Sequence, residues 1–144
     1  MIVLDAYAVL ALLKGEHASG EVRTLLAHGE EAVLTAPGVA EVVDHLIRLV
    51  GADEEDAALD IAQLGLDSPP PMDAFVAVRA GMLRARHYHR TDRAVSLADC
   101  VAAETARSSG SSLATADPHL LDVCRDENIA FIALPDSVGR TWTP

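Results

Sequence analysis

The sequence has few cysteines, few aromatic side chains and few positive charges. Its two cysteines, Cys100 and Cys124, stand apart without CxxC spacing, which argues against a disulfide framework and a zinc site. The five aromatic residues are too few for extensive stacking on nucleic-acid bases. With 11 basic and 22 acidic side chains, the net charge of -11 argues against capture of nucleic acid by a broadly basic surface.

Long hydrophobic runs are also absent. No uninterrupted apolar run approaches the roughly 20 residues that a membrane span needs, and the N-terminus lacks the basic segment of a signal peptide. We therefore expect a cytoplasmic protein that does not enter a membrane. About half of the 144 residues are hydrophobic, which is enough for a core. No linker, repeat or low-complexity tract divides the chain, so residues 1–144 are expected to form a single domain.

Hydrophobic periodicity predicts short strands that alternate with helices. The expected strands are Ile2–Leu4, Ala32–Thr35, Ser112–Thr115 and Ile129–Ala133. The expected helices cover 6–13, 19–28 with Ser19 as N-cap, 37–50, 52–66, 74–88, 96–110 and a segment from 118. This alternation predicts an α/β fold with a parallel sheet covered by helices on both faces.

Two acidic residues follow predicted strands. Asp5 and Asp117 therefore belong at the carboxyl edge of the sheet, where open α/β proteins bind ligands. Each is also suited to cap the helix that follows it, and Pro118 fits the first helical position after Asp117. Asp5 lies inside an apolar run, whereas a helix cap seldom has to be buried, so a functional role is favoured for Asp5.

Two further acids have equally ordinary explanations. Asp99 stands three residues after Ser96, which is the spacing of a capping box. It also lies at the rim of a strip of small residues, where a half-buried carboxylate would need a partner, so capping and function both stay open. Glu41 lies on the polar face of its helix and, judged alone, is an ordinary solvated residue.

Taken in order, these acids form a pattern that none of them forms alone. The segments are Asp5 after the first strand, "TAPGVAEVVDHL" with Glu41, "SLADCVAAETA" with Asp99 and "LATADPHLL" with Asp117. The ordered set, which covers nearly the whole chain, resembles the PIN-domain nucleases and, within them, the VapC-like toxins of toxin–antitoxin pairs. The resemblance implies a three-layer α/β/α fold in which the four acids meet in one pocket that binds Mg²⁺ or Mn²⁺.

The resemblance also implies an activity, namely metal-dependent endonucleolytic hydrolysis of RNA that leaves a 5'-phosphate and a 3'-hydroxyl. Four neighbouring carboxylates repel one another, and a hard divalent cation with oxygen ligands relieves that repulsion. Thr115 matches a threonine that often precedes the last acid of the family, so we expect it to support the site. Tyr7 stands where many relatives have a small polar residue, and its hydroxyl is a second candidate for support.

Scarce basic residues concentrate in one segment, "RAGMLRARHYHRTDR", which contains five of the eleven. We expect four of its side chains to hold the RNA backbone beside the pocket: Arg84, Arg86, Arg90 and Arg93. A solvated helix face explains any one of them at least as well. His87 and His89 are not expected to form a metal pair, because residues two apart on a helix point in different directions.

The resemblance further implies two protein partners, a small VapB-like antitoxin and a second copy of the chain. A non-catalytic alternative also stays open: a PIN-like binding module whose acidic surface engages a basic protein. Two enzyme classes are disfavoured. A dehalogenase-type phosphatase needs a second acid where the chain has Tyr7, and a Rossmann cofactor domain needs a glycine-rich turn that "DAYAVL" does not offer.

Overall fold

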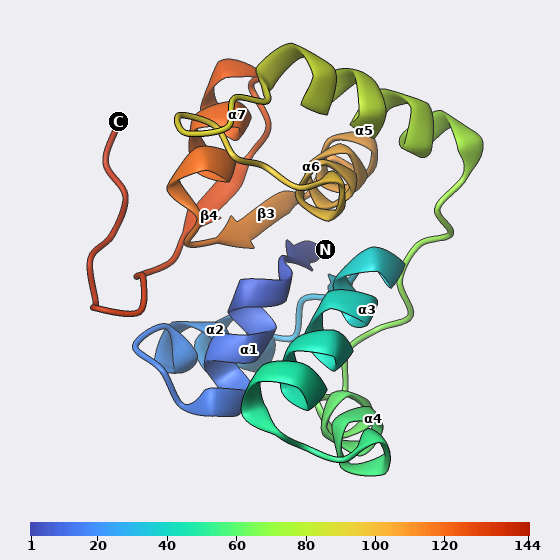
Figure 1. The fold of residues 1–144 in the computed structure, drawn as a ribbon, viewed down its shortest axis with the longest axis vertical. Helices are drawn as coiled ribbons and strands as arrows, with labels where there is room; N and C mark the ends of the chain where they lie inside the picture. The colour runs from blue at the N-terminus through green and yellow to red at the C-terminus, as the bar shows by residue number, and fades with distance from the viewer.

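The computed structural model describes residues 1–144, and its centre is a four-stranded sheet (Figure 1). The strands are β1 (Ile2–Leu4), β2 (Ala32–Leu34), β3 (Ser112–Thr115) and β4 (Phe131–Ala133). Their order in the sheet is β2-β1-β3-β4, and every neighbouring pair is parallel. The predicted α/β class with a short parallel sheet is confirmed.

Seven α-helices and one short π-helix connect the strands. They are α1 (Ala6–Lys14), α2 (Ser19–Ala27), α3 (Ala36–His45), η1 (Leu46–Val50), α4 (Glu54–Gln63), α5 (Ala74–His87), α6 (Leu97–Ser109) and α7 (Pro118–Asp126). None of these helices combines the length and the apolar character that crossing a membrane requires.

Alternating side chains of β1 divide the interior into two cores. Ile2 and Leu4 pack in one core with buried residues of α1, α2, α3 and α4. Val3 packs in the other core with buried residues of α5, α6 and α7. Since successive side chains of a strand point to opposite faces of the sheet, helices cover both faces. This is the three-layer α/β/α arrangement that the sequence predicts.

Polar side chains begin six of the seven α-helices. In each case the side chain accepts a hydrogen bond from a backbone N–H of the first turn. These caps are Asp5, Thr35, Asp53, Asp73, Ser96 and Asp117. The predicted capping box is present, with Ser96 and Asp99 bonding to each other in both directions.

The boundaries of three helices differ from the prediction. α4 covers Glu54–Gln63 and not 52–66, because Asp53 caps its start and the helix ends at Leu64. Ser19 is the first residue of α2 and not its cap, because its N–H already donates to the Glu16 carbonyl in the turn that leaves α1. The helix expected to run to Val50 widens into the π-helix η1 from Leu46 onward. Gly51 then ends this segment in the left-handed conformation (φ 84°) and donates to the Leu46 carbonyl.

Two strand boundaries also differ. Thr35 caps α3 and does not extend β2. β4 begins at Phe131, two residues later than predicted, because the N–H of Ile129 is still bonded to the Cys124 carbonyl of α7.

Candidate active site

The carboxyl ends of β1 and β3 lie next to each other in the centre of the sheet. β2 lies on the outer side of β1, and β4 lies on the outer side of β3, so the connections diverge between β1 and β3. Such a topological switch point is where open α/β sheets bind their ligands. Asp5 follows β1, and Asp117 follows β3 after one intervening residue, so both carboxylates lie at this point.

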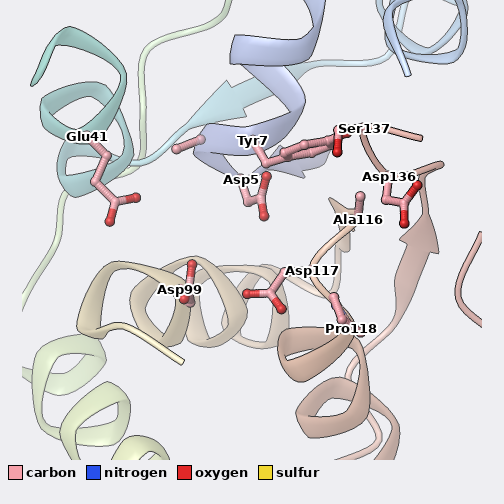
Figure 2. Close-up of a pocket in the computed structure, with 10 residues that line it drawn as sticks. Asp5, Tyr7, Glu41, Asp99, Ala116, Asp117, Pro118, Asp136 and Ser137 are labelled. Atoms are coloured by element: carbon pink, nitrogen blue, oxygen red, sulfur yellow. The ribbon is translucent and has the colours of Figure 1, made fainter. Parts of the chain in front are cut away.

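A cavity of about 340 Å³ opens at the switch point. All four predicted acids line it, each from a different segment: Asp5, Glu41, Asp99 and Asp117 (Figure 2). Asp5 and Asp117 come from the caps of α1 and α7, Glu41 comes from α3, and Asp99 comes from the first turn of α6. The fold therefore brings together acids that are far apart in the sequence.

Asp5 is the most constrained of these acids, with 6% of its surface exposed. Its Oδ1 accepts the N–H of Ala8 at 2.9 Å, and its Oδ2 accepts the hydroxyl of Thr115. Burial raises the pKa of the Asp5 carboxyl from 3.8 to about 7, against the opposing effect of these two hydrogen bonds. The negative charges of Asp99 and Asp117 contribute a smaller part of this increase. A positive charge in the cavity would stabilise the ionised form.

Thr115 joins two of the acids. It is completely buried, its hydroxyl donates to Asp5, and the same oxygen accepts the N–H of Asp117 at 3.0 Å. Thr115 does not line the cavity. Thr115 therefore positions the carboxylates of Asp5 and Asp117 through hydrogen bonds made outside the cavity.

Asp99 and Glu41 face the cavity from the α6 and α3 sides. Burial raises the pKa of Asp99, although its hydrogen bonds with Ser96 oppose the change, and the charge of Asp117 adds to it. Burial also raises the pKa of Glu41, and the charge of Asp99 adds to it. Asp99 thus caps α6 and lines the cavity at once, so the two explanations of this residue are compatible.

Tyr7 forms part of the cavity wall beside Asp5 (Figure 2). Its hydroxyl donates to the Pro135 carbonyl at 3.1 Å, which ties α1 to the segment after β4. Burial raises the pKa of this phenol, and nearby carboxylates, including Asp5, raise it further. Tyr7 therefore stays neutral and supports the wall of the site.

Two residues that line the cavity were missed by the sequence analysis, Asp136 and Ser137. The Asp136 carboxylate accepts the N–H groups of Arg140 and Val138, at 2.8 and 3.0 Å, and these bonds lower its pKa. Asp136 follows the strand β4, just as Asp5 and Asp117 follow β1 and β3. The rule that found those two acids, a carboxylate after a strand, also points to Asp136.

The donor chemistry of the cavity fits a hard divalent cation. The acids offer only oxygen ligands. Burial, and to a smaller extent the negative charge of neighbouring carboxylates, raises the pKa of Asp5, Glu41 and Asp99. No three acidic, histidine or cysteine side chains lie close enough together to share one ion in this structure. The negative charge and the oxygen ligands of the cavity therefore fit a divalent cation. The carboxylates themselves lie too far apart in this structure to coordinate one ion together.

The four predicted RNA-binding arginines lie on α5 and in the loop that follows it. Arg90 is exposed and has no hydrogen bond or salt bridge. The other three have partners within the protein: Arg84 with the Val95 carbonyl, Arg86 with Glu127, and Arg93 with Asp126. The same loop contacts the start of α7, where the Asp92 carbonyl bonds to a ring nitrogen of His119 at 2.9 Å.

Solved structures share this fold across nearly their whole length. VapBC2 from Rickettsia felis, bound to a DNA fragment from its promoter, matches with a TM-score of 0.68 and 18% identity over 92% of this chain and 98% of that one. VapBC-1 from nontypeable Haemophilus influenzae matches with a TM-score of 0.65 and 18% identity over 92% and 97%. FitAcB from Neisseria gonorrhoeae matches with a TM-score of 0.63 and 21% identity over 92% and 96%.

No curated protein matches the chain significantly. A sequence model of the PIN domain family matches residues 2–126, a range that contains all four predicted acids. Because this match covers most of the sequence, the chain belongs to the PIN domain family.

Proposed function

We propose that this single-domain protein is a cytoplasmic endoribonuclease that hydrolyses RNA phosphodiester bonds and depends on Mg²⁺ or Mn²⁺. PIN domains are generally nucleases, and this chain belongs to the PIN domain family. The proposal depends above all on one observation: four carboxylates from four segments line a single cavity at the switch point of the sheet. Such a set of oxygen ligands suits a divalent cation that acts on a phosphodiester.

The residues of the chain have separate tasks in this reaction. Asp5, Glu41, Asp99 and Asp117 would hold the cation, which supplies Lewis-acid chemistry by activating water and neutralising phosphate charge. Thr115 keeps Asp5 and Asp117 in register through its two hydrogen bonds. In-line attack of water on phosphorus breaks the bond to the 3'-oxygen and leaves a 5'-phosphate and a 3'-hydroxyl.

The alternative is a non-catalytic module whose acidic surface binds a basic protein. The burial of Asp5 favours catalysis over this alternative. A surface that recruits a basic partner needs accessible carboxylates, whereas Asp5 is 6% exposed and its ionised form is disfavoured. An isolated buried carboxylate is costly, and a bound cation offsets that cost.

We also propose that the protein is the toxin of a toxin–antitoxin module. The similar structures include VapBC2 and VapBC-1, from which we infer a small VapB-like antitoxin for this chain. We also propose that the chain forms a homodimer. Co-expression with a short neighbouring reading frame tests the first partner. The antitoxin is expected to co-purify with this chain and to suppress its RNA cleavage.

A cleavage assay tests the catalytic proposal. Single-stranded RNA is incubated with Mg²⁺ and the wild type, Asp5→Asn or Asp99→Asn, and Asp56→Asn on the remote helix α4 serves as a matched control. The wild type and Asp56→Asn are expected to cleave equally, whereas the two site variants are expected to lose about 100-fold or more. Full activity of both site variants would refute the catalytic assignment.

A further inference from the structure

The acidic cavity does not end at Glu41. A second cavity of about 250 Å³ continues along α3, shares Ala6 and Glu41 with the first, and is also lined by Asp44 and Arg48. In the opposite direction the first cavity is bounded by Asp136 in the segment after β4 (Figure 2). The two cavities form one groove, called here the two-part groove, which runs from the C-terminal segment across the four acids to α3.

Each end of the two-part groove carries an arginine that is paired with a groove-lining aspartate. At one end Arg48 of η1 bonds to Asp44 of α3, four residues earlier, with a closest N–O distance of 2.9 Å. At the other end Arg140 Nε lies 3.2 Å from the carboxylate of Asp136. The two arginine side chains are 63% and 80% exposed. An arginine–aspartate pair therefore lies on each side of the four acids, one from α3 and η1 and one from the segment after β4.

These pairs orient the guanidinium groups and leave donors free. A guanidinium carries five N–H donors, and it binds phosphate with geometrically matched pairs of them. Arg140 uses only Nε in its pair, so both terminal nitrogens are available, while Arg48 uses Nε and one terminal nitrogen. Exposed ion pairs contribute little to stability, so a phosphate can compete for either arginine at low cost.

We propose that Arg48 and Arg140 bind the phosphates on either side of the scissile bond, so that single-stranded RNA lies along the two-part groove. This inference rests on the proposed function, since it requires a polynucleotide substrate. The four acids repel a polyanion, and the two arginines supply positive charge where the flanking phosphates pass. A single strand fits because the target phosphodiester has to enter a cavity whose central acid, Asp5, is buried.

Arg140 also lies outside residues 2–126, the range that matches the PIN family. The turn that carries it is built locally, because Asp136 accepts the N–H groups of Val138 and Arg140, and the Asp136 N–H donates to the Arg140 carbonyl. This C-terminal turn therefore holds Arg140 next to Asp136 at one end of the groove.

Steady-state cleavage of a labelled single-stranded oligoribonucleotide tests the proposal. We compare the wild type with Arg48→Gln, Arg140→Gln and the control Arg23→Gln, which removes an exposed arginine of α2 that lines neither cavity. Each groove variant is expected to raise KM about tenfold with little change in kcat. The slope of log KM against log salt is expected to become shallower by about 0.7 for each lost phosphate contact. Arg140→Lys should recover part of the loss.

A dinucleotide with a single phosphodiester bond provides a second control, because it has no flanking phosphates. All variants are expected to cleave it with the kcat/KM of the wild type. Wild-type KM and salt slope for both groove variants on the longer RNA would overturn the proposal. It would also be overturned if these variants weakened binding of a VapB-like antitoxin and left the KM for RNA unchanged.

Failure of the proposed function would look different, because the wild type would then cleave neither substrate. Fluorescence anisotropy of the same labelled RNA still measures binding in that case. Weaker binding by Arg48→Gln and Arg140→Gln, but not by Arg23→Gln, would support the groove as an RNA-binding site without catalysis. Equal binding by all four proteins would refute it.

Discussion

Asp5 is subject to two opposing influences on its protonation state. As the N-cap of α1 it accepts a hydrogen bond from Ala8, and it accepts another from Thr115, and both favour the carboxylate. Burial and the charges of Asp99 and Asp117 favour the neutral acid, and they dominate, so the pKa rises to about 7. Folding without a cation therefore becomes less favourable as the pH rises through this value.

Asp5→Asn is accordingly expected to stabilise the cation-free protein at pH 8. Asparagine caps a helix about as well as aspartate and removes the buried charge. In EDTA, Tm should rise by about 2–4 °C for each kcal/mol gained, and the loss of wild-type stability between pH 5 and pH 8 should shrink. Saturating Mg²⁺ should raise the Tm of the wild type and leave Asp5→Asn nearly unchanged. A lower Tm of Asp5→Asn in EDTA would contradict this explanation.

Thr115 provides a second test at the same scale. Thr115→Val removes the hydroxyl that bonds both Asp5 and Asp117, and it is expected to lower kcat for RNA cleavage by about 10–100-fold. Thr115→Ser keeps the hydroxyl and should retain most of the activity. Thr105→Val changes another buried threonine, on α6 away from the cavity, and should leave kcat unchanged. Equal kcat values for Thr115→Val and Thr105→Val would show that cleavage does not need the hydrogen bonds from Thr115 to Asp5 and Asp117.

At the scale of elements, charged side chains join the helices on one face of the sheet. Glu127, at the end of α7, accepts hydrogen bonds from Arg86 and His87 of α5 and from Arg107 of α6. Burial alone would raise the pKa of Glu127, but the bonds from His87, Arg107 and Arg86 outweigh it and lower the pKa to about 2. This cluster holds together the helices that present Asp99 and Asp117 to the cavity.

The Glu127 cluster predicts a specific acid sensitivity. The pKa of Glu127 in the folded protein lies below the ordinary 4.5. The ionised carboxylate therefore stabilises the fold fully above pH 4.5, and this stabilisation is lost as the pH falls toward 2. Glu127→Gln is expected to lower the free energy of unfolding at pH 7 by about 2 kcal/mol and to flatten its pH dependence below 4.5. Urea unfolding at pH 7 and pH 3 measures both effects, with the exposed Glu21→Gln as control. An unchanged pH dependence would rule out this role.

Local signals determined most of the elements that the sequence could predict. Capping residues such as Ser96, and the left-handed glycine Gly110 at the other end, mark α6 clearly. The π-helical turns from Leu46 were not predictable, because apolar periodicity does not distinguish the wider turn. The partners of Arg86 and Arg93 were not predictable either, since they lie on or just after α7, far along the sequence. Only the fold shows these arginines already engaged.

The site was predictable to a similar extent and for a similar reason. Asp5 and Asp117 were predictable from the residues alone, because parallel strands present their following residues at a common edge. Asp99 stayed open between capping and function, and it joined the set only through the resemblance to the PIN-domain nucleases. Glu41 was an exception, since its helix pattern alone indicates a solvated residue, and only packing against α1 and α6 turns it toward the cavity. Asp136 was overlooked although it follows a strand.

For the whole molecule, the net charge is -11, whereas the substrate proposed for the groove is itself a polyanion. Bound cations and a few placed arginines therefore have to supply the local positive charge.

Apolar surface also remains uncovered, because Phe75, Val78 and Met82 share one face of α5 and each is more than half exposed. A homodimer that covers this face would remove it from water.

The homodimer is tested by light scattering after size-exclusion chromatography. The expected mass is twice the 15.2 kDa of the chain at micromolar concentration. Val78→Glu would place a charge in the centre of the α5 face and is expected to shift the mass toward the monomer. A monomeric wild type would exclude the homodimer, and a dimer unaffected by Val78→Glu would place the interface elsewhere.

The most direct test of the carboxylate site follows the products of RNA cleavage as the cation is added. End-labelled RNA is incubated with the wild type or Asp99→Asn in EDTA, and excess Mg²⁺ is then supplied. We expect internal cuts with 5'-phosphate and 3'-hydroxyl ends only for the wild type and only after Mg²⁺ is added. Cleavage in EDTA, or equal cleavage by Asp99→Asn, would contradict a metal-dependent endoribonuclease built on these four acids.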